Sequence, residues 1–204
     1  MTITWLGHAC FLLQSGGYRV IVDPCSGVPG VEDTSGEAEA VYCSHSHFDH
    51  CHTENIHLAS GKSSPFSVKE IASFHDDRRG ALRGENTIRT FTSEGITVVH
   101  LGDLGHIPDA QQIQEIGKCD VLLLPIGGTY TLDILNAKAT AEMIAPRLIC
   151  PMHYRRGKMG FDVLQTAEEF AAQYPADAVR WPEGNTLELT EETLSRGGVV
   201  FLNL

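Results

Sequence analysis

The sequence predicts an α/β (α+β) protein built from two β-sheets that pack against each other, with helices on the outside. Three observations support this prediction. Short strand-like segments follow one another in the first half of the chain, strands alternate with helical patterns in the second half, and 42% of the 204 residues are apolar. That apolar content suffices for a substantial core. No linker or low-complexity stretch interrupts the chain, so we expect one domain covering residues 1–204.

Short runs rich in apolar and β-branched residues predict the strands. Ser15-Gly16-Gly17 lies between the second and the third run and predicts a hairpin turn. The stretch from 27 to 39 is polar and rich in glycine, so we expect a loop there. The predicted strands cover residues 2–6, 10–14, 18–23, 41–44, 68–74, 87–92, 97–101, 121–125 and 148–151.

Helices are expected mainly in the second half of the chain. Residues 109–116, 137–145 and 163–174 each carry apolar side chains at helical spacing. Such helices have one apolar face, which the outer face of a sheet can bury.

Charge and hydropathy exclude several classes of protein. The formal net charge of -11 argues against sequence-independent nucleic-acid binding, which relies on Lys and Arg side chains that neutralise phosphates. No apolar run is long enough to cross a bilayer, and residues 1–5 lack the charged and apolar regions of a signal peptide. These features favour a cytoplasmic protein with no membrane or nucleic-acid partner.

The six cysteines show no paired spacing, which favours reduced thiols over disulfide bonds. Cys10, Cys43 and Cys150 lie in apolar, strand-like stretches, where buried thiols are common. Cys51 directly follows His50, and we expect it to be a neighbour of the histidines around it and not a metal ligand.

A run of histidines follows the predicted strand at 41–44. Ser44-His45-Ser46-His47-Phe48-Asp49-His50 holds three histidines and an aspartate within six positions. Imidazole and carboxylate groups together suit zinc, manganese or iron. His45 and His47 face the same side of an extended backbone, whereas Asp49 and His50 lie where the chain turns. One ion cannot easily take all four donors, so we expect two divalent metal ions, with zinc as the first choice.

A run of histidines can also arise without a functional metal site. Clustered histidines occur as fortuitous metal-binding tracts on protein surfaces, and isolated histidines are usually hydrogen-bonded structural residues. Five of the ten histidines fall between His45 and His57, and the densest part follows a strand. This concentration favours a metal site.

The run His45-x-His47-x-Asp49-His50 resembles the metal signature of the metallo-β-lactamase superfamily. The resemblance covers nearly the whole chain and points to a compact hydrolase branch similar to the ascorbate-6-phosphate lactonases and the N-acylphosphatidylethanolamine phospholipases. It implies a four-layer αββα sandwich with the metals at one edge between the sheets. The other matching segments are Trp5-Leu6-Gly7-His8-Ala9, Asp23-Pro24, Phe74-His75-Asp76, and residues 100–106, 125–128 and 151–154.

The resemblance also implies a set of metal ligands. They are His45, His47 and His75 for one ion, Asp49, His50 and His153 for the other, and Asp103 as a bridge between the two. Such a centre leaves room for a bridging water or hydroxide, whose pKa two dications would lower toward neutrality. The last three ligands in the chain each follow an apolar run, as expected of strand ends that meet at one edge.

Each of these later ligands has an ordinary structural alternative. Asp103 could be a turn residue, and His153 could be a buried, hydrogen-bonded histidine. His100 could take the role of His75, but it stands inside a strand three positions before Asp103 and should point away. We therefore assign His100 to the core or to a contact behind the ligands. Asp23 is the best candidate to hold the second ring nitrogen of a ligand histidine.

Asp49, His8 and His106 are the candidate catalytic residues. Asp49 could orient the attacking water, and the two histidines each follow a glycine in a family-like motif. Histidine suits proton transfer because its pKa lies near neutrality. Tyr154 is a further candidate for stabilising a leaving group. A plain structural role remains open for His8, His106 and Tyr154.

The leading functional hypothesis is a dinuclear metal-dependent hydrolase whose bridging hydroxide attacks an ester, lactone or phosphodiester of a small molecule. A nuclease would need a basic RNA-binding extension, and a di-iron oxygen-reducing enzyme would need a glutamate at His47; the chain has neither. A metal-binding scaffold or sensor without catalysis is the remaining alternative.

Two segments bear on substrate access. The segment from 51 to 74 is short, which implies an open site or one completed by a second copy in a homo-oligomer. Arg78, Arg79 and Arg83 form a basic stretch that either binds an anionic substrate or is simply solvated.

Overall fold

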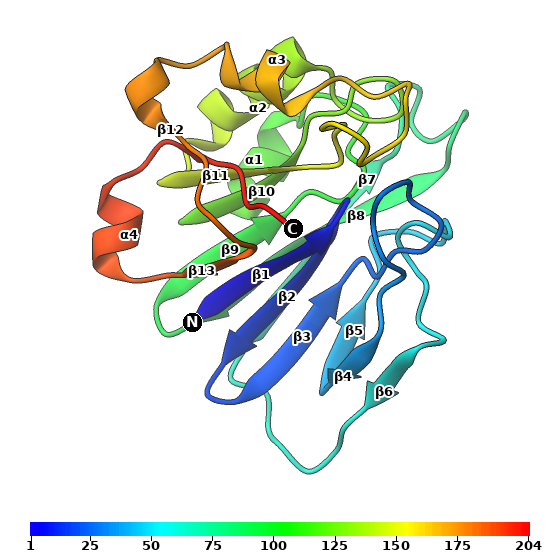
Figure 1. Ribbon diagram of the computed structural model, residues 1–204, viewed down its shortest axis with the longest axis vertical. Helices are drawn as coiled ribbons and strands as arrows, with labels where there is room; N and C mark the ends of the chain where they lie inside the picture. The colour runs from blue at the N-terminus through cyan, green and yellow to red at the C-terminus, as the bar shows by residue number, and fades with distance from the viewer.

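Two β-sheets pack face to face in the centre of the protein, as the computed structural model of residues 1–204 shows (Figure 1). The first sheet has the order β13 (Thr186–Glu188), β1 (Thr2–Gly7), β2 (Cys10–Ser15), β3 (Tyr18–Val22) and β5 (Ala40–Tyr42). The second has the order β12 (Val179–Arg180), β14 (Val199–Val200), β11 (Leu148–Met152), β10 (Val121–Pro125), β9 (Ile96–His100), β8 (Glu85–Ser93) and β7 (Ser67–Phe74). A separate pair joins β4 (Gly36–Ala38) to β6 (Ile56–Leu58).

Both sheets mix antiparallel and parallel strands. β1, β2 and β3 are antiparallel neighbours, and β5 runs parallel to β3. In the second sheet β7, β8 and β9 are antiparallel, whereas β9, β10 and β11 are parallel. Every residue of β10 and β11 is buried, as expected of parallel strands covered on both faces.

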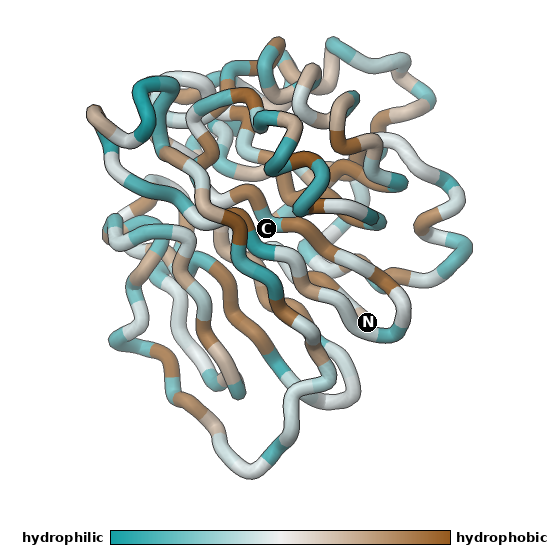
Figure 2. Tube along the Cα trace, turned by 180° about the vertical axis from the view of Figure 1, so that it is seen from behind, coloured by the Kyte–Doolittle hydropathy of each residue, from teal (hydrophilic) through white to brown (hydrophobic).

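The sheets and the helices packed against them share one contiguous core of 40 buried apolar residues. Burial alternates along β1, where Ile3 and Trp5 point inward while Thr2 and Thr4 stay half-exposed, because successive side chains of a strand face opposite sides. Figure 2 shows the hydrophobic stretches running along the strands between the layers.

Helices α1 (Ala110–Ile116), α2 (Ile134–Ile144) and α3 (Ala167–Ala171) lie over the outer face of the seven-stranded sheet (Figure 1). Each begins at a side chain that accepts a backbone N–H of the first turn, namely Asp109, Asp133 and Thr166. A fourth helix, α4 (Glu191–Ser195), connects β13 to β14. None of the helices has the length and the apolar character needed to cross a membrane.

The outer face of the five-stranded sheet is covered differently. Cys10 and Ile21 of this sheet pack against Val28 of the following loop and Ala38 of β4. The outer layer on this side therefore consists mainly of a loop and the β4–β6 pair, and α1–α3 lie on the other side.

Glu39 holds the segment between β4 and β5 to the sheet. Its carboxylate accepts hydrogen bonds from the guanidinium of Arg19 on β3 and, at 2.6 Å, from the ammonium of Lys62. Hydrogen bonds from Arg19 and Lys62 lower the pKa of Glu39 to about 2, because they favour the charged carboxylate.

The structure confirms the predicted fold class and every predicted strand, with ends shifted by one or two residues. The sequence did not predict β6, β12, β13, β14 or α4, and three predicted segments differ in extent. The predicted loop at 27–39 contains the short strand β4, and the predicted helix at 163–174 shrinks to α3 because Thr166 caps its start. The predicted helix at 137–145 begins earlier, at Ile134, because Asp133 caps it.

The strands that matter for the site end at one edge. The residues that follow β1, β3, β5, β7, β9 and β11 are His8, Asp23, the run 44–50, His75, Asp103 and His153.

Candidate metal centre

The histidine run lies in a closed loop after β5. A disulfide bond joins Cys43 to Cys51, with Cα atoms 5.3 Å apart, so the expectation of reduced thiols is wrong for this pair. Within the loop, His50 and Cys51 donate their backbone N–H groups to the carbonyl of His47. The loop turns back on itself, and the turn brings together two cysteines that are eight positions apart. The other four cysteines are buried free thiols.

One group of potential ligands consists of His45, His47 and His75, whose ring nitrogens lie within 4.8 Å of one another. His45 Nε2 lies 2.9 Å from His47 Nδ1. His75 donates from Nδ1 to the carbonyl oxygen of Tyr130 at 3.0 Å, which leaves its Nε2 free to face the group.

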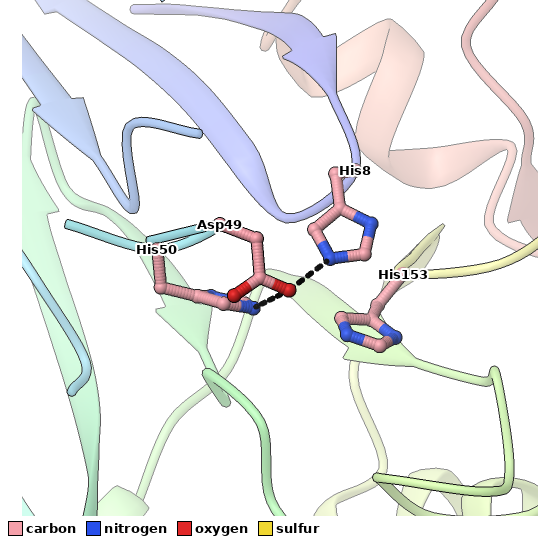
Figure 3. A group of neighbouring side chains, drawn as sticks. All are labelled: His8, Asp49, His50 and His153. Carbon is pink, nitrogen blue, oxygen red and sulfur yellow. Dashed lines mark ion pairs between the residues drawn. The ribbon is translucent and has the colours of Figure 1, made fainter. Parts of the chain in front are cut away.

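A second group consists of His8, Asp49, His50 and His153, again with donor atoms within 4.8 Å (Figure 3). Asp49 Oδ2 lies 3.3 Å from His8 Nε2 and 3.9 Å from His50 Nε2. The rings of His8 and His153 are in contact, with centroids 4.0 Å apart.

Asp103 lies between the two groups. Its carboxylate oxygens are 3.1 Å from His75 Nε2, 3.2 Å from His50 Nε2 and 3.2 Å from His153 Nε2. It therefore touches one histidine of the first group and two of the second, and it is almost fully buried. This is the place that a bridging carboxylate would take.

Asp23 orients His50 from behind. It is fully buried, accepts a hydrogen bond from His50 Nδ1 at 2.8 Å and from the backbone N–H of Ser44 at 2.6 Å, and also binds the Ser44 hydroxyl. The Ser44 hydroxyl lies 2.9 Å from His45 Nδ1. The expected partner of a site histidine is thus in place, and through Ser44 it reaches both groups.

The backbone is strained where three of these residues lie. His8, Asp23 and His153 have φ values of 52°, 50° and 53°, in the left-handed region that residues with a Cβ seldom adopt. Strained backbone at the ends of three strands, each carrying a residue at or directly behind the two groups, is typical of functional sites.

Two glycines allow the loops behind the ligands to pack closely. A Cβ on Gly105 would lie 2.4 Å from the carbonyl carbon of His75, and one on Gly127 would lie 2.2 Å from the carbonyl oxygen of His153. A side chain at either position would push a histidine backbone out of place.

Burial and charge act on the protonation of the site. Burial lowers the pKa of His8 and of His45 to about 3, so both imidazoles are neutral at neutral pH and their lone pairs are available. Burial alone would raise the pKa of Asp103, but His153 and His50 outweigh it and hold that pKa well below its usual range. Burial likewise works against a charged His50, yet Asp103 and Asp23 raise its pKa well above the usual value.

The donor set fits divalent metal ions. Buried polar atoms without a hydrogen-bond partner gather here: Nδ1 and Nε2 of His8, Nε2 of His50, Oδ1 of Asp103 and Nδ1 of His153. His50 Nε2 lies close to Asp103 Oδ1 but makes no hydrogen bond with it. Unpaired buried donors and acceptors are costly in a protein interior, and a metal ion held by Nε2 of His50 and Oδ1 of Asp103, which lie 3.2 Å apart, would satisfy both.

Three candidate residues from the sequence lie elsewhere. His106 Nε2 accepts the backbone N–H of Phe74, and its Nδ1 lies 2.9 Å from the carbonyl of Ile107, so its ring is held away from both groups. His100 bonds through both ring nitrogens to backbone atoms in the core, which confirms its assignment to the core. Tyr154 packs against Trp5 in the core, and burial raises its pKa.

An open cavity of about 380 Å³ lies over the two groups. Its walls include Arg83, one of the three arginines for which the sequence left substrate binding open, and three residues that sequence reasoning did not place at the site, namely Phe48, Tyr130 and Phe161. Phe48 lies inside the histidine run, so its place in the sequence could have indicated that it lines the site. Tyr130 and Phe161 are distant in sequence and carry no motif.

Comparison with known proteins identifies the family. A family model described as a β-lactamase superfamily domain matches residues 2–153. A metal-dependent hydrolase of Methanosarcina mazei is 32% identical, over 83% of this chain and 89% of the relative, and one of Archaeoglobus fulgidus is 29% identical, over 76% and 83%. A Thermotoga maritima crystal structure, assigned to a Zn-dependent hydrolase of the metallo-β-lactamase superfamily, has a TM-score of 0.76 at 34% identity, over 98% of each chain.

The chain belongs to the metallo-β-lactamase superfamily, and within it to the group of metal-dependent hydrolases.

Proposed function

We propose that the protein hydrolyses an ester, lactone or phosphodiester of a small molecule with two divalent metal ions, zinc before manganese or iron. His45, His47 and His75 would hold one ion, and Asp49, His50 and His153 the other. The observation that carries the proposal is the position of Asp103, whose carboxylate lies within 3.2 Å of histidine nitrogens from both groups.

Bound dications lower the pKa of a water molecule toward neutrality and polarise the carbonyl or phosphoryl oxygen of a substrate. The protein's own residues would place the reactants. Asp49 lines the cavity, and its Oδ2 lies 3.3 Å from Nε2 of the buried His8, so Asp49 is placed to accept a proton from the attacking water and His8 to share it. Asp23 fixes the ring of His50. His106 has no part in this proposal.

The size of the cavity supports a small-molecule substrate. A volume of about 380 Å³ falls at the lower end of typical ligand pockets, which span roughly 300–1,000 Å³. The net charge of -11 further disfavours nucleic acid as a substrate.

The test is a hydrolysis screen of aryl esters, lactones and phosphodiesters with zinc- or manganese-loaded protein. We expect turnover of at least one class, and a loss of at least about 100-fold in kcat/KM for His47→Ala and Asp49→Asn. His57→Ala is the matched control, because His57 is an exposed histidine on β6 outside both groups. Metal binding without turnover of any class would favour a scaffold or sensor and contradict the proposal.

A further inference from the structure

Arg83 is the one arginine or lysine that lines the cavity over the metal centre. Its Nη2 donates a hydrogen bond to the carbonyl of Thr129 at 3.1 Å, and its guanidinium lies over the ring of Tyr130, 5.6 Å from the centroid. No carboxylate of the protein lies within ion-pair distance of it, although acidic residues outnumber basic ones 26 to 15. Its remaining N–H donors are available to a ligand.

The backbone of Arg83 is held firmly. The carboxylate of Asp76 is buried and accepts backbone N–H groups from Arg78, Gly80, Leu82 and Arg83 at 2.8–3.0 Å. These bonds close the segment from 76 to 83 around one acceptor. Asp76 is therefore a positioning residue for the backbone of Arg83, and the contacts with Thr129 and Tyr130 direct its guanidinium.

The guanidinium is also tied to the metal centre. The same Tyr130 whose ring lies under Arg83 accepts a hydrogen bond from His75 Nδ1 through its carbonyl oxygen. Tyr130 thus separates Arg83 from the proposed ligand His75, and Arg83 lines the cavity without belonging to either group of potential ligands. A group bound there would belong to the part of the substrate that does not react.

The remaining walls are aromatic. Phe48, Tyr130 and Phe161 line the cavity, and Phe48 is 61% exposed although its side chain is large and apolar. An exposed aromatic side chain beside a polar floor is typical of a surface that receives an apolar ligand.

We propose that Arg83 binds a negatively charged group on the non-reacting part of the substrate, next to an apolar body that packs against Phe48, Tyr130 and Phe161. The substrate is then an anionic small molecule, such as an acyl or aryl compound with a carboxylate, sulfonate or phosphate remote from the bond that is cleaved. This inference rests on the proposed hydrolytic function. Two dications carry more charge than Asp49 and Asp103, so the floor of the cavity would also favour an anion.

The first experiment compares two esters with the same leaving group, 4-nitrophenyl butyrate and mono-4-nitrophenyl glutarate, which differ in a terminal carboxylate. We expect the zinc-loaded protein to favour the anionic ester in kcat/KM. Arg83→Met should lower the ratio of the two kcat/KM values by about tenfold, since a hydrogen bond to a charged group is strong but this guanidinium is partly solvated. Arg83→Lys should give an intermediate ratio, because it keeps the charge and loses the planar donor fork.

Arg78→Met is the matched control, since Arg78 is exposed in the same segment, does not line the cavity, and binds Asp76 only through its backbone. It removes the same charge, so a ratio that falls equally in both variants would overturn a specific role for Arg83. An unchanged ratio in Arg83→Met would overturn it as well.

The second experiment measures binding without turnover. Benzenesulfonate, an aromatic anion that is a weak metal ligand, is titrated calorimetrically into wild-type and variant protein. We expect binding that weakens about tenfold in Arg83→Met and stays unchanged in Arg78→Met. Equal affinity in the two variants, or no binding to the wild type, contradicts the inference. If neither ester is cleaved, that result counts against the proposed hydrolysis, and the titration alone decides on Arg83.

Discussion

Replacing Asp23 with Asn removes one negative charge behind the metal centre with almost no change in shape. Asn is well suited to the position, because the φ of 50° there is one that Asn tolerates better than most residues. The amide oxygen can still accept the backbone N–H of Ser44. The amide nitrogen, however, is a donor where His50 Nδ1 needs an acceptor.

The size of the effect follows from the contact that is lost. The bond between His50 Nδ1 and the Asp23 carboxylate is 2.8 Å long, buried and charge-assisted. Hydrogen bonds to charged groups contribute roughly 1.5–3 kcal/mol, which corresponds to a factor of about 10 to 100 in an equilibrium constant. We therefore expect zinc to bind about 10- to 100-fold more weakly at the group that contains His50, in line with other residues that orient metal ligands.

Calorimetric titration of metal-free protein with zinc, in competition with a chelator, measures this affinity. We expect two binding events in the wild type and selective weakening of one of them in Asp23→Asn. Asp120→Asn is the matched control, because Asp120 is as buried as Asp23 and also accepts a backbone N–H, from Thr97. Asp120 precedes the first residue of β10, at the end of the sheet away from the metal centre. It should reduce stability without changing either zinc affinity.

The reasoning fails if Asp23→Asn binds both zinc ions with wild-type affinity. It also fails if Asp120→Asn weakens zinc binding by the same factor, because the loss would then reflect general destabilisation.

Three further predictions concern the scaffold. Hydrogen bonds from two cationic side chains lower the pKa of Glu39 from 4.5 to about 2, so the stability that they contribute is complete above pH 4.5 and is lost as the pH falls toward 2. Glu39→Gln should therefore flatten the fall of Tm between these pH values, and an unchanged slope would refute this role of Glu39. Gly105→Ala would bring a Cβ to 2.4 Å from the His75 carbonyl carbon, so we expect the unfolding free energy in urea to fall by about 1–3 kcal/mol and one zinc ion to bind more weakly. Unchanged stability and unchanged zinc affinity would show that the loop shifts to make room for the methyl group. The double variant Cys43→Ser/Cys51→Ser removes the disulfide that closes a loop of eight positions, and it should lose about 2–3 kcal/mol of unfolding free energy in the metal-free protein. Reduction of the wild type should cause the same loss. Unchanged stability in both cases would contradict a stabilising role of this disulfide.

The sequence predicted those parts of the fold that local pattern controls. Most strands that end at the site are rich in apolar residues, so their positions could be predicted, and the polar residues after them indicated the edge. Strands β12, β13 and β14 span only two or three residues, which is too short for a periodic pattern. β13 pairs with the longer β1 and β14 with the longer β11, and β12 in turn pairs with β14.

The candidate site shows the same limit. His45, His47 and His50 stand in one motif, and the structure brings them together with His75 and His153 from distant strands. His106 also follows a glycine in a motif, but the ring turns toward the backbone of β7, and nothing in the local sequence determines this direction.

The contacts that no sequence motif predicted join residues or loop ends that are brought together by the folded chain. The disulfide depends on how the loop from 43 to 51 folds back, and the wall of the cavity depends on contacts between Arg83 and Tyr130 across 47 positions. Such pairings follow from the packing of the whole fold and not from spacing.

Anomalous diffraction from crystals of the zinc-loaded protein tests the central claim most directly. We expect two peaks at the zinc edge in each chain, one bounded by His45, His47 and His75, the other by Asp49, His50 and His153, with Asp103 between them. A single peak, or peaks away from these residues, would contradict the dinuclear centre.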